Sequence, residues 1–284
     1  MKLFDSKFLF WSITIPVLFS GACNIINPAE EIPAYIEVDS VGVYTDLQTQ
    51  GSASSNIVDF WVTVDGQFLS GYELGRKAPV LFNGMHTVTL KAGILLNGIE
   101  GTRVPYAVFT SFDTLLNLLP GDVYKMIPRV TYLSGAVIPL DENFDNNSLL
   151  FSTPVTSAPI TVEAGNFDGN CGIVVMNAAT PSFECTSIDS FDLPGGSTPT
   201  YVEINYQCNT DFSIGVKANT TLGPLDFPLL GIRSNATWKK IYVNLTSVVS
   251  QAQHATGWKI YMTSSLATGA TTDTLRFDNI KLVY

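Results

Sequence analysis

The segment YVEINYQC, residues 201–208, alternates between two kinds of side chain. Its even positions, from Val202 to Cys208, are apolar or aromatic, and its odd positions, from Tyr201 to Gln207, are mostly polar. A period of two places the two sets on opposite faces of a β-strand. The segments TWKKIYVNL, residues 237–245, and GWKIYMT, residues 257–263, repeat the pattern. The pattern therefore predicts that the second half of the chain forms β-strands whose aliphatic faces point toward a core.

The first half carries the same signal. In NIVDFWVTVDGQFLSGYEL, residues 56–74, the even positions from Val58 to Val64 are apolar, and Asp65-Gly66 follows. That dipeptide is a strong two-residue hairpin signal. NGMHTVTLKAG, residues 83–93, alternates again, and we interpret its His86 as a structural residue at a turn. Long helical periodicities are missing, so the sequence predicts an all-β chain built as two antiparallel β-sandwich domains.

The N-terminus has the layout of a secretory signal. Lys2 and Lys7 precede an uncharged run from Phe8 to Phe19, which is shorter than the roughly 20 apolar residues of a membrane-spanning helix. The Gly-Ala-Cys ending at Cys23 resembles a bacterial lipobox, although Ser20 stands where that pattern usually has Leu. The resemblance implies acylation of Cys23 and an outer-membrane lipoprotein, with surface export as in Bacteroidota. The alternative is an ordinary signal peptide with an incidental cysteine.

These observations divide the chain into four parts. Residues 1–22 form the signal peptide, 23–33 a lipidated tether, 34–138 the first sandwich and 139–284 the second. The chain has 15 Lys and Arg against 25 Asp and Glu, and removal of the signal takes away two lysines and one aspartate. So acidic a chain argues against nucleic acid as a partner.

Three further cysteines lie in the second sandwich. The segment CGIVVMNAATPSFEC, residues 171–185, reads as a hairpin that would pair Cys171 with Cys185 while keeping one apolar face. Such pairing predicts a Cys171–Cys185 disulfide, which an oxidising compartment would allow. Cys208 shares the inward face of its strand, so we expect it to be a buried free thiol.

Family resemblances sharpen the fold. Residues 64–93 resemble transthyretin-like or Ig-like repeats of bacterial surface proteins. The closing LRFDNIKLVY, residues 275–284, and the opening LDENFDNN, residues 140–147, resemble the jelly rolls of carbohydrate-binding modules. Those modules often hold a structural calcium between the first and last strands, which here implies Glu142, Asp145 and Asp278. The alternative is that these carboxylates are solvated or paired with Arg276 and Lys281; no other cofactor is expected.

The polar and aromatic faces of the second sandwich are the best candidate for activity. Aromatic rings can stack on sugars, and polar side chains beside them can bind hydroxyls. The same face could instead pack on the first domain, on another subunit, or on nothing. The candidate ligand-binding residues are Tyr201, Glu203, Asn205, Trp238, Lys240, Tyr242, Lys259 and Tyr261.

No catalytic motif stands out in the sequence. There is no Gly-x-Ser-x-Gly elbow, no His-Glu-x-x-His and no phosphate-binding loop. The first prediction is therefore a non-enzymatic scaffold or interaction subunit of an envelope complex, for β-barrel assembly, secretion or nutrient uptake. The alternative is a glycan-binding surface lipoprotein, and a hydrolase is a remote third option.

Overall fold

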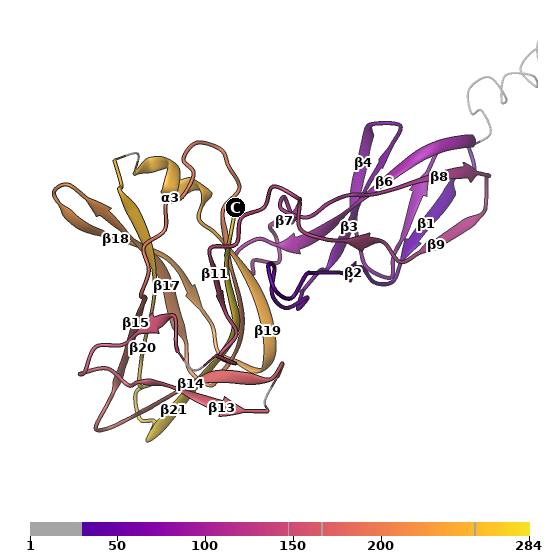
Figure 1. Ribbon diagram of the computed structural model, residues 1–284. Coiled ribbons are helices and arrows are strands. Elements are labelled where there is room, and N and C mark those ends of the chain that lie inside the picture. The colour runs from indigo at the N-terminus through magenta and orange to yellow at the C-terminus, as the bar shows by residue number, and fades with distance from the viewer. Residues whose placement is uncertain (1–29, 147, 166, 253) are drawn as a thin grey trace, which may run out of the picture.

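The computed structural model describes residues 30–146, 148–165, 167–252 and 254–284. Strands make up nearly all of the regular structure in this part of the chain, as Figure 1 shows. The predicted all-β fold is confirmed. The signal segment and Cys23 fall outside the described residues.

The first half of the described chain holds ten strands. They are β1 (Ala34–Val38), β2 (Gly42–Val43), β3 (Asp59–Val64), β4 (Gln67–Glu73), β5 (Lys77–Val80), β6 (Gly84–Leu95), β7 (Arg103–Pro105), β8 (Phe112–Leu118), β9 (Val123–Met126) and β10 (Arg129–Val130).

These strands form a first β-sandwich. One sheet has the order β4-β3-β6-β7, with β8 also paired to β6, and the facing strands pair as β5-β1-β9 and β10-β2. The pairs β1–β9 and β10–β2 are parallel, which departs from the purely antiparallel sandwich that the sequence predicts. β1 lies between β5 and β9, which run in opposite directions. It is therefore antiparallel to β5 and must be parallel to β9. Phe60, Val62 and Val64 of β3 fill the core, as their alternation predicts.

The second half holds eleven strands and one helix. They are β11 (Leu140–Glu142), β12 (Phe151–Ser152), β13 (Ile160–Ala164), β14 (Asn170–Asn177), β15 (Ser182–Ser187), β16 (Tyr201–Cys208), β17 (Phe212–Thr220), β18 (Gly223–Ile232), β19 (Asn235–Asn244), α3 (Thr246–Gln251), β20 (Gly257–Ser265) and β21 (Thr272–Val283).

The second β-sandwich has two layers around one apolar core. The six-stranded sheet β13-β14-β21-β16-β19, with β11 paired to β21, is called the near sheet because it faces the first sandwich (Figure 1). The five-stranded sheet β12-β15-β20-β17-β18 is called the far sheet. The inward residues Val202, Ile204 and Val243 belong to the shared core, as predicted from the strand parity.

Two local features follow the sequence. Asp65 and Gly66 connect β3 to β4 with positive φ angles of 47° and 80°, which is the backbone that the hairpin signal requires. In residues 275–284 the apolar positions change from odd (Leu275, Phe277) to even (Ile280, Leu282), and a β-bulge lies there: Asn279 has φ 47° and the register of β16 against β21 shifts. Beyond the bulge, Lys281 faces the first sandwich.

The predicted Cys171–Cys185 disulfide is wrong. Cys171 lies on β14 of the near sheet and Cys185 on β15 of the far sheet, so the expected hairpin does not form. The turn between these strands passes from one layer of the sandwich to the other, and alternation alone cannot reveal that. Both thiols are free and buried, and so is Cys208, as predicted for it. No helix among the described residues is long and apolar enough to span a bilayer.

Candidate functional site

The outer face of the near sheet is covered by the first sandwich. Glu203 pairs with Tyr242 across β16 and β19, and Asn205 pairs with Lys240, so these side chains share a face as the sequence indicates. The part of that face around Glu203 and Lys240 is buried under residues of the first sandwich, whereas Val162 and Val175 on β13 and β14 stay exposed. Of the alternatives left open by the sequence, packing on the first domain is the one the structure shows. The covered candidates are Tyr201, Glu203, Asn205, Lys240 and Tyr242.

Glu203 is the centre of this interface. Its Oε1 accepts hydrogen bonds from the hydroxyls of Tyr106, at 2.6 Å, and Tyr132, at 2.8 Å, both from the first half of the chain. Its Oε2 lies 2.6 Å from Nζ of Lys240. Burial raises the pKa of Glu203, but Lys240, Lys281 and the Tyr106 donor more than offset it, so the pKa is lowered. The carboxylate is therefore ionised and paired in the folded protein.

The loop of residues 44–58, between β2 and β3, is held on the near sheet by two buried lysines. Lys281 donates from Nζ to the carbonyl oxygens of Gln50 and Ser52, each at 2.6 Å, and Lys240 donates to that of Ser54 at 2.6 Å. Backbone carbonyls are good acceptors that would otherwise be buried without partners. The loop thus gains its hydrogen bonds from the second sandwich instead of from a strand of its own.

The remaining three candidates lie elsewhere. Trp238 is half-buried near the edge of the near sheet and stacks on Phe167, with ring centroids 4.8 Å apart. Lys259 and Tyr261 are on β20 of the far sheet, on its outer side. Nζ of Lys259 donates to the carbonyl of Ile188 at 2.6 Å, and the Tyr261 ring lies against Gly215, where a Cβ atom would come within 2.5 Å. Only a small part of the Tyr261 ring is exposed, so it offers little surface for stacking.

The predicted calcium ligands are not gathered as a group. Among the described residues, no three His, Cys, Asp or Glu side chains form a metal site. Glu142 accepts from the backbone N–H groups of Phe144 and Leu150 with its two oxygens, at 2.9 and 2.5 Å, and Asp145 accepts from that of Asn170 at 2.9 Å. Glu142 therefore ties a loop instead of facing a shared cation.

Asp278 is different, because part of its carboxylate has no partner. It is fully buried; Oδ1 accepts from the N–H of Asn279 at 2.7 Å, whereas Oδ2 makes no hydrogen bond within the described chain. Burial, with the nearby charges of Asp168 and Asp145, raises the pKa of Asp278 to about 7. An orphaned buried carboxylate oxygen can take a cation only if backbone or water oxygens supply most of its other ligands.

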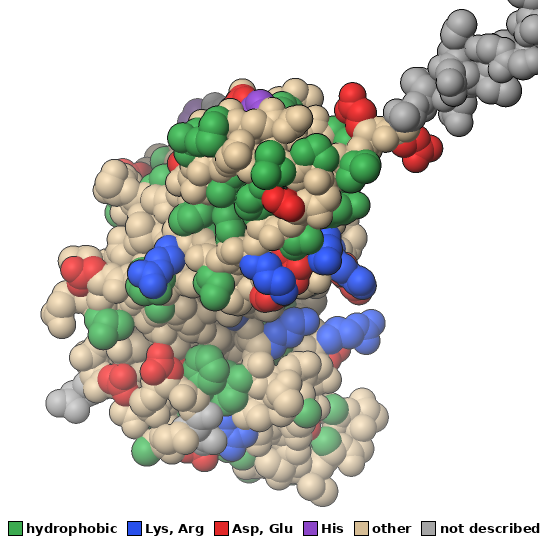
Figure 2. Space-filling model, turned by 90° about the vertical axis from the view of Figure 1, so that its right-hand side faces the viewer, with side chains coloured by type: hydrophobic (Ala, Val, Ile, Leu, Met, Phe, Trp, Pro, Cys, Tyr) green, Lys and Arg blue, Asp and Glu red, His purple; other side chains and the backbone are tan. Residues whose placement is uncertain are grey.

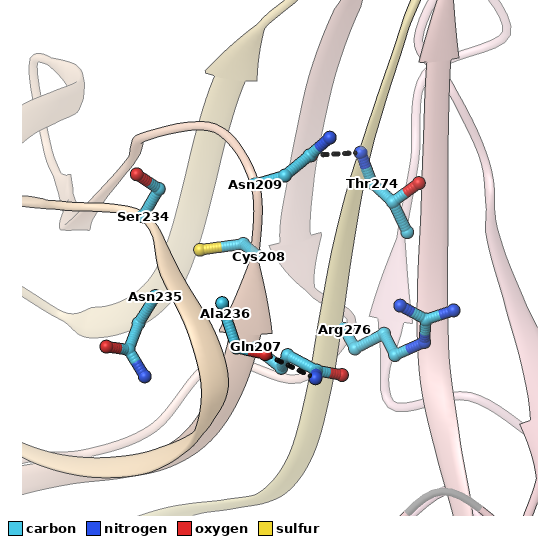
Figure 3. A pocket seen from close by; sticks show the side chains of 8 residues that line it. All are labelled: Gln207, Cys208, Asn209, Ser234, Asn235, Ala236, Thr274 and Arg276. Atoms are coloured by element: carbon cyan, nitrogen blue, oxygen red, sulfur yellow. Dashed lines mark hydrogen bonds between the residues drawn. The ribbon is translucent and has the colours of Figure 1, made fainter.

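Side chains that line a cleft at the edge of the near sheet already hydrogen-bond to one another and to the backbone. Its volume is about 430 Å³, and Figure 3 shows its lining at the ends of β16, β19 and β21. Gln207 donates to the carbonyl of Ala236, the Asn209 side chain accepts from the N–H of Thr274, and Arg276 pairs with Glu163, each at 2.7 Å. These groups offer few free hydrogen bonds to a ligand.

A groove of about 510 Å³ on the first sandwich has the opposite character. It lies on the outer face of the sheet that contains β3, β4 and β6, and Trp61 is its floor. The indole stacks on Phe68, with ring centroids 5.5 Å apart and planes at 20°, and Phe68 is 54% exposed. The two rings form a partly exposed apolar platform.

Glycines on both neighbouring strands make room for the indole. A Cβ atom at Gly71 on β4 would lie 2.8 Å from Cε2 of Trp61. At Gly93 on β6 it would lie 2.7 Å from Cβ of Asp59 and 2.8 Å from Nε1 of Trp61. Any larger residue at either position would push the ring off the sheet, so the pair of glycines defines the shape of the groove.

Charged side chains line one side of the groove. Nη1 of Arg103 lies 2.5 Å from Oδ1 of Asp59, and Nη2 lies 3.1 Å from Oε1 of Glu73. Burial raises the pKa of Asp59, and the hydrogen bond and charge of Arg103 partly oppose that rise. Oδ2 of Asp59 and Nε1 of Trp61 have no hydrogen-bond partner within the described residues. Both atoms are closed to solvent, so the exposed polar groups of the groove are those of Glu73 and Arg103.

Part of this groove can be predicted from the sequence, although the candidate residues named above do not include it. Asp59, Trp61 and Thr63 have the parity opposite to the buried Phe60 and Val62, so an outward tryptophan could be read from the strand. Phe68 could not, because it reaches the same face only through a β-bulge in which Val62 pairs with Ser70 and Thr63 with Phe68.

Comparison with known proteins gives the following. No family model matches the chain, and no curated protein matches it. Solved structures with similarity include the CBM22-1–GH10 modules of Clostridium thermocellum xylanase 10B with xylohexaose, at 14% identity and TM-score 0.40, over 51% of this chain and 28% of that one. Our chain thus spans a little over a quarter of that protein.

Two further structures complete the comparison. Carbohydrate-binding modules of the β-sandwich superfamily with promiscuous specificity match at 13% identity and TM-score 0.39, over 80% of this chain and 85% of that one. The family 11 carbohydrate-binding module of Clostridium thermocellum, with a mixed-linked tetrasaccharide, matches at 13% identity and TM-score 0.36, over 50% and 93%. The saccharides named are ligands of those proteins, and the β-sandwich architecture of this chain is established by its own strands.

Proposed function

We propose that this chain is a non-enzymatic glycan-binding protein, and that the ligand lies on the Trp61–Phe68 platform of the first sandwich. The observation that carries the proposal is a single groove in which stacked aromatic rings, one of them 54% exposed, lie beside the charged side chains of Glu73 and Arg103. The C–H face of a pyranose supplies apolar surface for the rings, and its hydroxyls both donate and accept.

The polar groups indicate a neutral sugar. The side chain of Glu73 is 55% exposed at the groove, and its ionised carboxylate can only accept hydrogen bonds, so it suits a donor such as a sugar hydroxyl. Asp59 and Glu73 give the groove two carboxylates against the single guanidinium of Arg103, which disfavours uronic acids and sulfated sugars. Both carboxylates are paired with Arg103, so we propose no catalytic role for them.

The cellular setting is part of the same proposal. The signal-like N-terminus and the lipobox-like Gly-Ala-Cys at Cys23 support a lipid-anchored protein of the outer membrane, displayed at the cell surface. A scaffold role in an envelope complex is the first expectation from the sequence alone. The groove makes glycan binding the better supported of the two. A structural Ca²⁺ bound at Asp278 is an additional proposal, supported by the orphaned Oδ2.

A glycan array tests the ligand class. The wild-type protein should bind neutral polysaccharides, and Trp61→Ala should lower the affinity at least about tenfold, which corresponds to 1.4 kcal/mol. Trp238→Ala is the matched control, since Trp238 also stacks on a phenylalanine but lies far from the groove in the sequence and on the other sandwich. Failure of the wild type to bind any polysaccharide would contradict the proposal, as would equal binding by Trp61→Ala.

A further inference from the structure

One end of the first sandwich is apolar. Leu81 lies in the connection from β5 to β6, and Leu119 in the turn from β8 to β9. The ends of these strands meet, because Gly84 pairs with Leu118, Ala34 with Val80, and the N–H of Gly121 donates to the carbonyl of Pro33. We define the apolar end by five side chains: Ile32, Leu81, Met85, Leu119 and Val123.

These side chains are unusually exposed. Ile32 is 66% exposed, Leu81 60% and Met85 59%, and Leu119 and Val123 follow at 44% and 39%. Figure 2 looks onto this end, and hydrophobic side chains gather there close to the point where the described chain begins. Single exposed leucines are ordinary, but a group of large apolar side chains on neighbouring loops marks a surface that meets an apolar partner.

The charges around the apolar end limit the class of partner that can bind there. Glu30, Glu31 and Asp122 are exposed beside it, and the sequence has no Lys or Arg in 30–34, 80–86 or 117–123. Anionic lipid head groups and acidic proteins would be repelled, because membrane recruitment by charge needs basic residues. A neutral apolar environment, such as the acyl region beneath zwitterionic head groups, fits the surface.

The position of the predicted anchor points to the same partner. Cys23 precedes Pro33 by so few residues that, at about 3.5 Å per extended residue, the sandwich stays within roughly 35 Å of an acylated Cys23. The chain leaves the sandwich at the apolar end itself (Figures 1 and 2). We infer that the apolar end inserts shallowly into a lipid bilayer, as a second membrane contact beside the acyl chains of Cys23. This inference rests on the proposed acylation of Cys23.

The insertion also orients the molecule. If the apolar end lies at the lipid surface, the second sandwich points away from it, because the opposite end of the first sandwich packs on the near sheet (Figure 1). The Trp61 groove then lies outside the membrane, because β6 leads from Met85 at the apolar end to Lys91, which pairs with Trp61.

Site-directed spin labelling tests the insertion. The mature lipoprotein is reconstituted in phosphatidylcholine liposomes at a low ratio of protein to lipid, with a nitroxide at Leu119→Cys. Leu222→Cys is the matched control, because Leu222 is 99% exposed at the β17–β18 turn of the other sandwich. Cys171, Cys185 and Cys208 are buried and should not take the label. We expect the label at position 119 to collide several-fold less with a water-soluble nickel complex, and more with oxygen, than the label at 222.

Equal accessibility of the two labels to the nickel complex would overturn the inference. Shielding at position 119 that grows with the amount of protein, without a gain in oxygen collisions, would indicate contact between copies of this chain and would also overturn it. Mass spectrometry of the same preparation distinguishes a missing lipid anchor from a failure of the apolar end to insert. An unmodified Cys23 removes both the insertion and the proposed membrane location, whereas an acylated Cys23 with a water-exposed label removes the insertion alone and leaves glycan binding at Trp61 intact.

Discussion

Glu203 and Lys240 lie side by side on adjacent strands of the near sheet, with Oε2 and Nζ 2.6 Å apart and almost no exposure to water. Two tyrosines of the first sandwich complete the shell around the carboxylate. A face that the sequence marks as a possible sugar platform is therefore a buried polar interface. Glu203 and Lys240 can stay charged there because each binds groups from both halves of the chain.

Removing one partner of this pair should destabilise the protein strongly. Lys240→Met leaves Glu203 with an uncompensated buried charge, which typically costs about 3–5 kcal/mol. Urea unfolding measures the change in the free energy of unfolding. Lys259→Met on the far sheet is the control and should change it by less than about 1 kcal/mol. Equal effects of the two substitutions would show that the Glu203–Lys240 pair is not buried between the sandwiches.

Lys281 should make the stability depend on alkaline pH. Burial and the charge of Lys240 together lower the pKa of Lys281 to about 8, against the opposing charges of Glu203, Asp141 and Asp168. An unfolded lysine titrates near pH 10.4, so this side chain binds more protons in the unfolded chain between pH 8 and 10, and its contribution to the free energy of unfolding should rise with pH there. Urea unfolding of the wild type and Lys281→Met at pH 8 and 9.5 checks this. The wild type should gain relative to the variant; a relative loss contradicts the lowered pKa.

The glycines of the groove give a shape test that keeps both aromatic rings. Gly93→Ala introduces a Cβ atom against Asp59 and Trp61, so we expect the glycan affinity to fall by roughly tenfold. Gly101→Ala is the matched control, since Gly101 also lines the groove but a Cβ atom there meets nothing within 4 Å. Isothermal titration with a neutral glycan measures both. A larger loss for the Gly101 variant would place the ligand at the rim instead of on Trp61.

Calcium should stabilise the protein through Asp278. Added Ca²⁺ at 100 times its dissociation constant would raise the free energy of unfolding by about 2.7 kcal/mol, and EDTA would reverse the effect. In Asp278→Asn the calcium effect should vanish. In EDTA at pH 8 that variant should be at least as stable as the wild type, because it no longer buries a charge that is disfavoured there. Thermal unfolding with and without Ca²⁺ decides; a full calcium effect in Asp278→Asn excludes this residue as a ligand.

The sequence predicts the local parts of the fold well and the contacts between distant segments poorly. Alternation predicts the faces of β3 and β16, and Asp65-Gly66 predicts its turn, because both depend on near neighbours in the chain. Alternation does not say what a face will meet. The loop 44–58 has no strand pattern, yet it supplies the carbonyl groups that Lys240 and Lys281 bind more than 180 residues later. The predicted Cys171–Cys185 disulfide is wrong for a related reason: the pattern does not show that the turn between these strands passes from one sheet to the other.

The covered face of the near sheet is the claim on which the location of the binding site depends, and hydrogen exchange tests it most directly. The N–H of Asn56 donates to the Tyr242 hydroxyl, and that of Asn97 to the Tyr242 carbonyl, each at 2.9 Å. Both bonds cross between the sandwiches, so both amides should exchange slowly by NMR. In Tyr242→Phe only Asn56 should exchange faster. If both amides in the wild type exchange as fast as those of an unfolded chain, the two sandwiches are not packed together and the account is contradicted.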